Sequence, residues 1–168
     1  IVGSIIGIQY IDGKLKKAIN KNKEDITKSA IAFENIPKNI SIKNRIEILG
    51  VLYDDANCSN QYNKMEFIRI QNSKQNLKRL RFCAVQIFHC NINHYQSLQE
   101  LKYLNFEIPQ TQFTKFISDI EIYFQCWKDG KLFKSYPTNG LVLKINSRKL
   151  QKYIQKNNLS ANWAYVID

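Results

Sequence analysis

Short segments in which apolar side chains recur at every second residue constrain the fold of this chain more than any other feature. A period of two is typical of half-buried β-strands, whereas a period near three or four indicates a helix. Leu98, Leu101 and Leu104 recur every third residue and predict a short helix over 95–104. The alternating pattern predicts strands at 45–53, 65–70, 79–88, 120–127 and 132–136, with a further strand at 141–145.

Glycines at two places support these predicted strands. Gly50 lies inside the first of them, and a glycine within a strand often marks a bulge or a sharp bend. Asp129-Gly130 lies between two alternating segments, which is a strong signal for a tight hairpin turn. We therefore expect 120–127 and 132–136 to pair as a hairpin.

Three strands, a helix and two closing strands follow the order of the OB-fold, a partly open five-stranded barrel. We predict a mainly β protein with an OB-fold-like five-stranded antiparallel barrel over 46–146 and a helix between strands 3 and 4. Ser147 is suited to cap a helix over 148–156, so 147–168 is expected to form a C-terminal helix and tail.

Residues 1–45 are expected to form an N-terminal extension of undecided structure. Its pattern predicts a strand at 1–10, a turn at Asp12-Gly13, an exposed loop at 20–29 and a short strand at 31–33. The chain starts at Ile1 rather than Met, so we expect further chain upstream.

The charge of the chain indicates a polyanionic partner. It has 25 Lys+Arg against 14 Asp+Glu, a formal net charge of +11, and a pI near 9.5. A small basic barrel is most simply explained as a binder of single-stranded nucleic acid. A second interpretation is that the charge only keeps a Lys- and Asn-rich chain in solution.

Nothing in the sequence indicates catalysis, a cofactor or a metal. It contains none of the common nucleophile, zinc-protease or phosphate-loop motifs, and we predict a non-enzyme. The spacings of Cys83, Cys90, His89 and His94 fit no zinc pattern. The four cysteines form no C-x-x-C pair, which favours free thiols in a reducing compartment.

Several short motifs between residues 46 and 145 resemble one known family. Ile48-Leu49-Gly50-Val51-Leu52 is similar to the first strand of the telomere single-strand-binding OB domain found in protection-of-telomeres proteins and in the ciliate telomere end-binding α subunit. Further similar motifs are Lys64–Ile70, Val85–Phe88 with Asn93–Leu98, Ser118–Ile122 and Lys128–Leu132. The resemblance implies a nuclear protein that binds telomeric DNA beside other telomere or telomerase subunits.

The resemblance and the charge together suggest a binding surface. Phe67 and Tyr95 match family positions where aromatic rings stack on bases, although Phe67 also fits a core position. Basic residues on the predicted strands and on the last hairpin are expected to follow the phosphates, or else to form a solvated face: Arg69, Arg79, Arg81, Lys128 and Lys131.

Two other functions fit the same sequence. An OB-fold accessory subunit of telomerase or of a telomere complex would act by docking a protein partner. An RNA-binding subunit of a ribonucleoprotein would use the same positive charge. The sequence does not decide among DNA, RNA and protein as the main ligand, nor does it give the preferred sequence or the oligomeric state.

Overall fold

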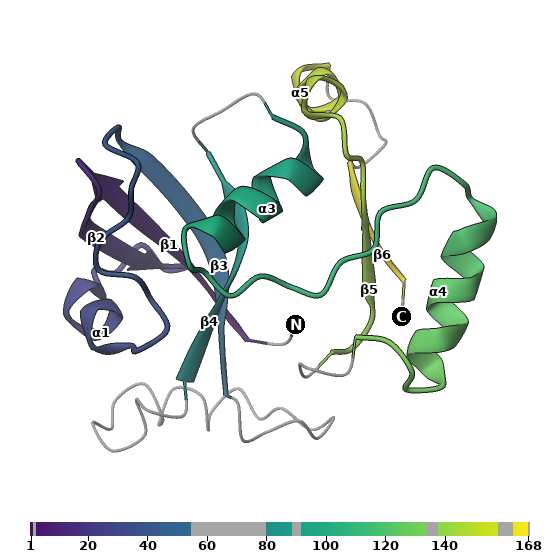
Figure 1. Ribbon diagram of the computed structural model, residues 1–168, viewed down its shortest axis with the longest axis horizontal. Helices are drawn as coiled ribbons and strands as arrows, with labels where there is room; N and C mark the ends of the chain where they lie inside the picture. The colour runs from purple at the N-terminus through teal and green to yellow at the C-terminus, as the bar shows by residue number, and fades with distance from the viewer. Residues whose placement is uncertain (2, 55–79, 89–91, 134–137, 158–162, 168) are drawn as a thin grey trace.

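The computed structural model describes residues 1, 3–54, 80–88, 92–133, 138–157 and 163–167, and Figure 1 shows how their elements are arranged. Its strands are β1 (Ser4–Ile11), β2 (Lys14–Asn20), β3 (Ile46–Asp54), β4 (Leu80–Ile87), β5 (Leu141–Lys144) and β6 (Ala164–Ile167). Its helices are α1 (Thr27–Ala32), α3 (His94–Tyr103), α4 (Ser118–Lys128) and α5 (Arg148–Lys156).

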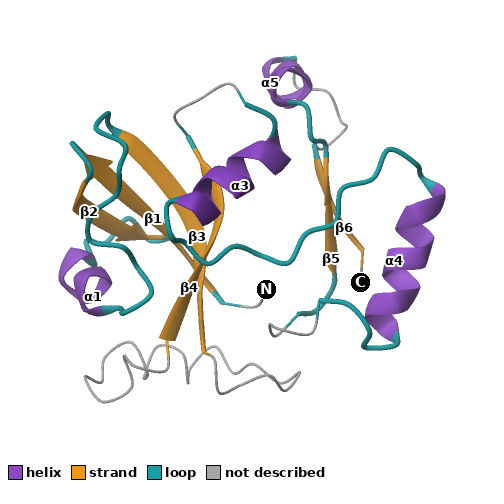
Figure 2. Cartoon of the chain, in the orientation of Figure 1, coloured by secondary structure: helices purple, strands orange, loops and turns teal. Residues whose placement is uncertain are grey.

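The strands form two separate antiparallel sheets. The first has four strands in the order β2-β1-β3-β4, and the second pairs β5 with β6. The chain is therefore mainly β with a few helices, as Figure 2 shows, but the described residues form no closed barrel. The predicted five-stranded barrel is not found, because residues 120–127, expected as one of its two closing strands, are helical. The further strand β5 pairs with β6 instead of joining the larger sheet.

The N-terminal segment is an integral part of the larger sheet. Asp12 and Gly13 both have positive φ angles, 51° and 75°, and turn β1 back into β2. Positive φ at both central positions is the geometry of a tight two-residue hairpin turn, so this prediction is confirmed. β1 also pairs with β3, from Ser4 with Leu52 to Tyr10 with Ile46. The predicted strand at 1–10 is confirmed, and it lies in the middle of the sheet.

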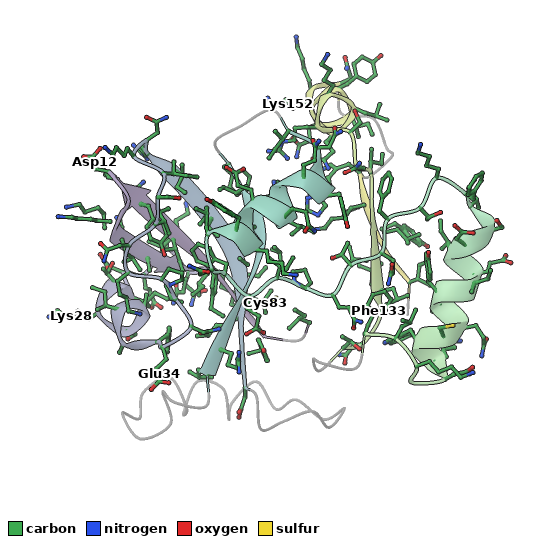
Figure 3. The ribbon with its side chains drawn as sticks, in the orientation of Figure 1. Asp12, Lys28, Glu34, Cys83, Phe133 and Lys152 are labelled. Carbon is green, nitrogen blue, oxygen red and sulfur yellow. The ribbon has the colours of Figure 1, made fainter. Side chains whose placement is uncertain are left out.

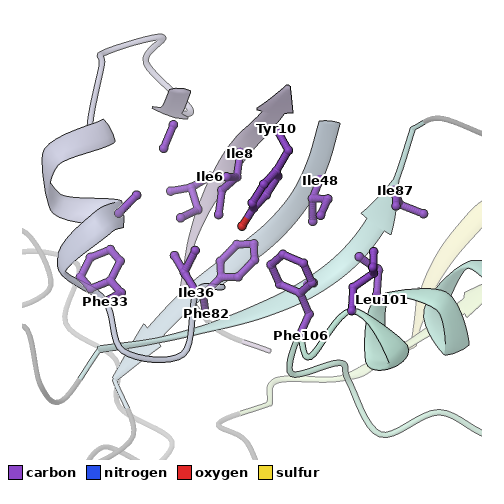
Figure 4. Close-up of a cluster of buried hydrophobic side chains, with 14 of the residues drawn as sticks. Ile6, Ile8, Tyr10, Phe33, Ile36, Ile48, Phe82, Ile87, Leu101 and Phe106 are labelled. Atoms are coloured by element: carbon purple, nitrogen blue, oxygen red, sulfur yellow. The ribbon is translucent and has the colours of Figure 1, made fainter. Parts of the chain in front are cut away.

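The core lies on one face of this sheet, between the strands and the helices α1 and α3 (Figure 4). Ile6, Ile8 and Tyr10 alternate inward along β1, as a half-buried strand requires. Leu98 and Leu101 of α3 pack on the same cluster, which confirms the predicted helix and its apolar face. The Tyr10 hydroxyl donates to the Pro37 carbonyl at 2.6 Å, so the one polar group of this ring is satisfied inside the core.

Gly50 is a glycine because another strand approaches it too closely for a side chain. A Cβ at this position would lie 2.2 Å from the Phe82 ring and 2.6 Å from the Cys83 carbonyl oxygen. The register of β3 against β4 shifts between Leu49 and Gly50, so the predicted bulge is confirmed.

The outer edge of β4 is covered by side-chain and backbone groups from other segments. The Asn35 side chain donates to the Phe82 carbonyl at 2.9 Å and accepts from the Phe82 amide at 3.1 Å. The Ala84 amide donates to the Glu107 carbonyl at 2.7 Å. Asn35 and Glu107 thus supply hydrogen bonds that a neighbouring strand would otherwise supply.

Two strand predictions are wrong because those residues are helical. In the segment 31–33, predicted as a short strand, Ile31 and Ala32 end α1 and Phe33 is its C-cap. The predicted loop 20–29 already enters this helix at Thr27. Residues 120–127 belong to α4, which has Asp119 and Glu121 in its first turn and Lys128 in its last, as the helix dipole favours.

The predicted hairpin turn at Asp129-Gly130 is instead the end of α4. Gly130 has a φ of 64°, and its amide donates to the Trp127 carbonyl at 2.9 Å. The Lys131 amide donates to the Cys126 carbonyl at 2.7 Å. This pair of bonds around a left-handed glycine is the Schellman motif, which ends helices. Residues 131–133 form no strand, and the rest of 132–136 lies outside the described residues.

The C-terminal predictions are largely confirmed. β5 and α5 lie where strand 141–145 and helix 148–156 were expected, and Ser147 Oγ accepts from the Leu150 amide at 3.4 Å. β6 was not predicted. In the part of the chain that the structure describes, no helix is long and apolar enough to cross a membrane.

Candidate functional site

A cleft of about 600 Å³ lies between the larger sheet, α3 and the β5–β6 pair. Its walls also include the extended segment 109–114 and the first turns of α4. Figure 1 shows α4 on the side of the small sheet that faces away from the larger sheet. The lining is mostly apolar and aromatic, with few charged groups. A concave, largely apolar site with a few polar groups is typical of a small-ligand pocket.

Asn146 closes one end of the cleft by joining β5 to α3. Its carbonyl accepts from the His94 amide at 2.9 Å, and its side-chain oxygen accepts from the Tyr95 amide at 2.8 Å. Asn93 and Gln96 add a capping box to the same helix start. The first turn of α3 is therefore held against the end of β5 by hydrogen bonds from both chain segments.

Three basic side chains gather near this junction. The pKa of His94 is lowered to about 4, first because the ring is buried and then because the positive charges of Lys144 and Arg148 oppose its protonation. Burial also lowers the pKa of Lys144. His94 and Lys144 both line the cleft. This end of the cleft is thus basic and poorly solvated, which favours binding of an anion.

Aromatic rings lie beside these basic groups. Lys144 Nζ lies 5.9 Å from the centroid of the Trp163 ring, and the Arg148 guanidinium lies 5.8 Å from that of Phe88. Tyr95 packs on Phe113 with ring centroids 5.6 Å apart. Tyr95, Phe113 and Trp163 all line the cleft, so its walls offer flat surfaces next to positive charge.

The structure places four of the predicted binding residues. Tyr95 lines the cleft. Arg81 on β4 forms an ion pair with Glu107, with Nη2 2.8 Å from Oε2. Lys128 lies over the Phe124 ring, 4.5 Å from its centroid, at the end of α4, and Lys131 follows it with an ion pair to Asp129 at 2.9 Å. The other three, Phe67, Arg69 and Arg79, lie outside the described residues.

The predicted residues do not form one stripe on adjacent strands. Arg81 belongs to β4, whereas Lys128 and Lys131 lie at the end of α4, because the segment expected as a strand is a helix. Whether any of them contacts nucleic acid stays a prediction. Among the described residues, no group of three His, Cys, Asp or Glu side chains is placed to hold a metal ion.

The residues at the basic end of the cleft are not among the binding residues predicted from the sequence. Lys144 ends an otherwise apolar strand, Leu141–Lys144, and a lysine in such a position is a signal of a buried charge. In the sequence, His94 belongs to a Cys/His spacing that fits no zinc pattern and to the Asn93–Leu98 motif, and neither indicates a basic site. Arg148 lies 17 positions from Lys131, the nearest basic residue of the predicted set, and only the fold brings it near His94.

Comparison with known proteins gives one consistent name. No protein-family model matches this sequence. A DNA ligase of Prochlorococcus marinus (strain NATL2A) is 25% identical, over 99% of this chain and 30% of that protein. A DNA ligase of Mycoplasma mycoides is 26% identical over 98% of the chain, and one of Wigglesworthia glossinidia brevipalpis is also 26% identical over 98%. They are covered over 28% and 33% of their own lengths.

This chain is similar to a part of DNA ligases. It spans about three-tenths of the length of the relatives it matches.

The likeness corrects three predictions made from the sequence. The resemblance to telomere single-strand-binding proteins is wrong, since relatives matched over nearly the whole chain are ligases. The prediction of a non-enzymatic telomere-binding function is wrong for the same reason, and neither telomerase docking nor ribonucleoprotein RNA binding fits better. The prediction of a non-enzyme is contradicted because the relatives are named as enzymes. The nuclear location stays a prediction.

Proposed function

We propose that this chain is a domain of a DNA-joining protein and that its cleft binds the phosphate of a nucleotide or of a DNA end. The observation that carries this proposal is the match to DNA ligases over 98–99% of the chain. Because the chain spans only part of those ligases, the complete joining activity would also require regions outside it.

The chemistry of the cleft supports a phosphate ligand. Joining two DNA ends forms a phosphodiester bond, so a site for this reaction has to hold a phosphate and balance its negative charge. Lysine and arginine side chains in a poorly solvated pocket do this well, because electrostatic interactions are stronger where water is excluded. Lys144 and His94 supply positive or hydrogen-bonding groups from the wall of the cleft, and Arg148 adds charge beside them.

The aromatic walls suit the rest of such a ligand. A base presents a flat face that stacks on Tyr or Trp rings, and each such contact is worth about 1–3 kcal/mol. Tyr95 and Trp163 lie in the same cleft as Lys144. We assign these rings to the base or sugar of the ligand and the basic end to its phosphate.

A titration with a deoxynucleoside 5′-monophosphate, and with the same deoxynucleoside lacking the phosphate, tests the binding role. We expect the monophosphate to bind and the deoxynucleoside without the phosphate to bind far more weakly. The Lys144→Gln substitution should lower the affinity for the monophosphate at least tenfold. Lys128→Gln removes one charge at the end of α4 and serves as the matched control, with binding unchanged. Equal binding of the two ligands would show that the cleft does not recognise phosphate.

Sealing of a nicked duplex carrying a 5′-phosphate tests the joining role. The assay uses the protein that carries this chain, and the Lys144→Gln variant should lose most of its activity. Absence of sealing by the unmodified protein would contradict the proposal of DNA joining, whatever the cleft binds.

A further inference from the structure

Residues 131–167 carry basic side chains and no acidic ones. Between Gly130 and Ile167 the sequence contains no Asp or Glu. The remaining residues hold all 14 acidic side chains against 18 of the 25 basic ones. Most of the positive net charge therefore comes from this short stretch, which contains Lys131, Lys134, Lys144, Arg148, Lys149, Lys152 and Lys156.

The lysines of α5 share one exposed face. Lys149, Lys152 and Lys156 are exposed and lie three and seven positions apart. With 3.6 residues per turn, they fall within an arc of about 60°, and Tyr153 widens this arc to about 100°. The opposite side of the helix carries its buried residues, Gln151 and Ile154. We call Lys149, Lys152, Tyr153 and Lys156 the α5 face; Figure 3 labels Lys152 on it.

Hydrogen bonds on the inner side of α5 orient the α5 face toward solvent. The Gln151 side chain donates to the Ile145 carbonyl at 2.6 Å and accepts from the Arg148 guanidinium at 2.8 Å. Arg148 also lies over the Phe88 ring, 5.8 Å from its centroid, and so belongs to the inner contacts of the helix. The helix is anchored to the end of β5, and its three outer lysines point away from that anchor together with the 60% exposed ring of Tyr153.

We propose that the α5 face binds the phosphate backbone of duplex DNA, outside the cleft. Seven residues of helix span about 10 Å, and one strand of a duplex presents a phosphate about every 3.4 Å along its axis. Three lysines over this length match about three phosphates of one strand. Such contacts position a protein on DNA without reading its sequence, and Tyr153 can pack on the sugar between them. The proposal rests on the proposed function for its choice of DNA as the polyanion.

Salt dependence of binding gives a direct test on the 168-residue chain. Affinity for a labelled duplex is measured over a series of salt concentrations for the wild type and for a Lys149→Gln, Lys152→Gln, Lys156→Gln variant. Each lost phosphate contact reduces the slope of log affinity against log salt by about 0.9, so the variant should lose about 2.7. A variant with arginine at the same three positions should keep the slope.

A second triple variant controls for net charge. Lys14, Lys16 and Lys17 are exposed on β2, which Figure 1 places far from α5 across the molecule. Changing these three to Gln removes the same charge and should leave the slope within about 0.5 of the wild type. Because every substituted side chain is exposed, we expect all variants to fold. Their melting temperatures check this.

The outcomes separate this inference from the proposed function. An unchanged slope for the α5 variant, equal losses for both triple variants, or no salt-sensitive DNA binding by the wild type would each overturn the role of the α5 face. A loss of slope confined to the α5 variant supports the role of the α5 face even if the protein seals no nick. In that case only the proposed joining function fails. Sealing without a selective loss leaves the joining function in place and refutes the α5 contact.

Discussion

The backbone amide of Tyr95 donates a hydrogen bond to the side-chain oxygen of Asn146, 2.8 Å away, and so joins the first turn of α3 to the end of β5. The two residues are 51 positions apart in the sequence. α3 packs on the larger sheet, whereas β5 belongs to the smaller one. This bond is one of the contacts that fix the width of the cleft between them.

Removal of the Asn146 side chain should therefore affect both stability and ligand binding. Asn146→Ala removes the acceptor from the Tyr95 amide, and we expect a loss of about 1 kcal/mol in the free energy of unfolding. Asn146→Asp keeps an acceptor at the same place and should retain that stability at neutral pH. Urea unfolding of the two variants measures the difference. Equal stability of Asn146→Ala and the wild type would show that water replaces the bond at no cost.

Protonation of His94 should destabilise the fold in mild acid. Its pKa in the folded chain is about 4, whereas that of an unperturbed histidine is 6.5. The unfolded chain therefore takes up the proton first as pH falls. His94 contributes its full stability above pH 6.5 and loses it progressively between pH 6.5 and 4.

Two measurements check this behaviour of His94. The melting temperature should fall more between pH 7 and pH 5 in the wild type than in His94→Gln, which cannot take up the proton. NMR titration of the ring should give a pKa well below 6.5, and a bound phosphate monoester should raise it by opposing the charges of Lys144 and Arg148. A normal pKa near 6.5 would mean that the ring is solvated.

Gly50→Ala should be strongly destabilising, and Gly7→Ala should not. The added methyl group at position 50 meets the Phe82 ring at 2.2 Å, whereas at position 7 its nearest neighbour is Ile19 Cγ1 at 3.6 Å, an ordinary contact. Overpacking of a core typically costs about 1–3 kcal/mol, so Gly50→Ala should lose at least that much. Thermal unfolding compares the two variants. Recovery of stability in Gly50→Ala combined with Phe82→Leu would identify the ring as the cause.

Glu107→Ala should cost far more stability than Glu47→Ala, although each removes an ion pair with an arginine. Glu107 accepts from the buried Tyr53 hydroxyl and pairs with Arg81, and its side chain is 18% exposed. Loss of this acceptor should cost about 1–3 kcal/mol. Glu47 and Arg45 are both more than half exposed, and a pair of that kind contributes less than about 1 kcal/mol. Denaturant midpoints of the two variants test this order.

Two Asp-Gly pairs explain how far local sequence could predict this fold. Asp12-Gly13 follows an alternating strand and forms the expected hairpin, with both residues at positive φ. Asp129-Gly130 looks the same in sequence but ends a helix, with only Gly130 at positive φ. The difference lies in the preceding residues. Ile120, Phe124 and Trp127 fit a helical spacing as well as Ile120, Ile122 and Phe124 fit an alternating one, and the charges at the two ends of α4 favour the helix.

The cleft could not be predicted because it depends on contacts between distant segments. α3, β5 and α5 were predicted close to their observed bounds, and Ser147 was correctly identified as a cap. The elements against which these three pack were not predicted. Residues 141–145 were predicted as a further strand of the OB-fold, whereas β5 pairs with β6 in a separate sheet, so Lys144 was not expected beside His94. Short motifs of strand and turn residues also occur in unrelated β proteins, which is why the resemblance to telomere proteins was misleading.

The hydrogen bonds of Asn35 to Phe82 have a consequence for the behaviour of the chain at high concentration. An open sheet edge can recruit a strand from another molecule and start aggregation. Along β4, Asn35 and Glu107 already use the backbone groups of Phe82 and the amide of Ala84 that such a strand would need. The two segments therefore block the addition of a strand from another molecule. Loss of the Asn35 amide should appear first as reduced solubility of the protein and not as weaker ligand binding.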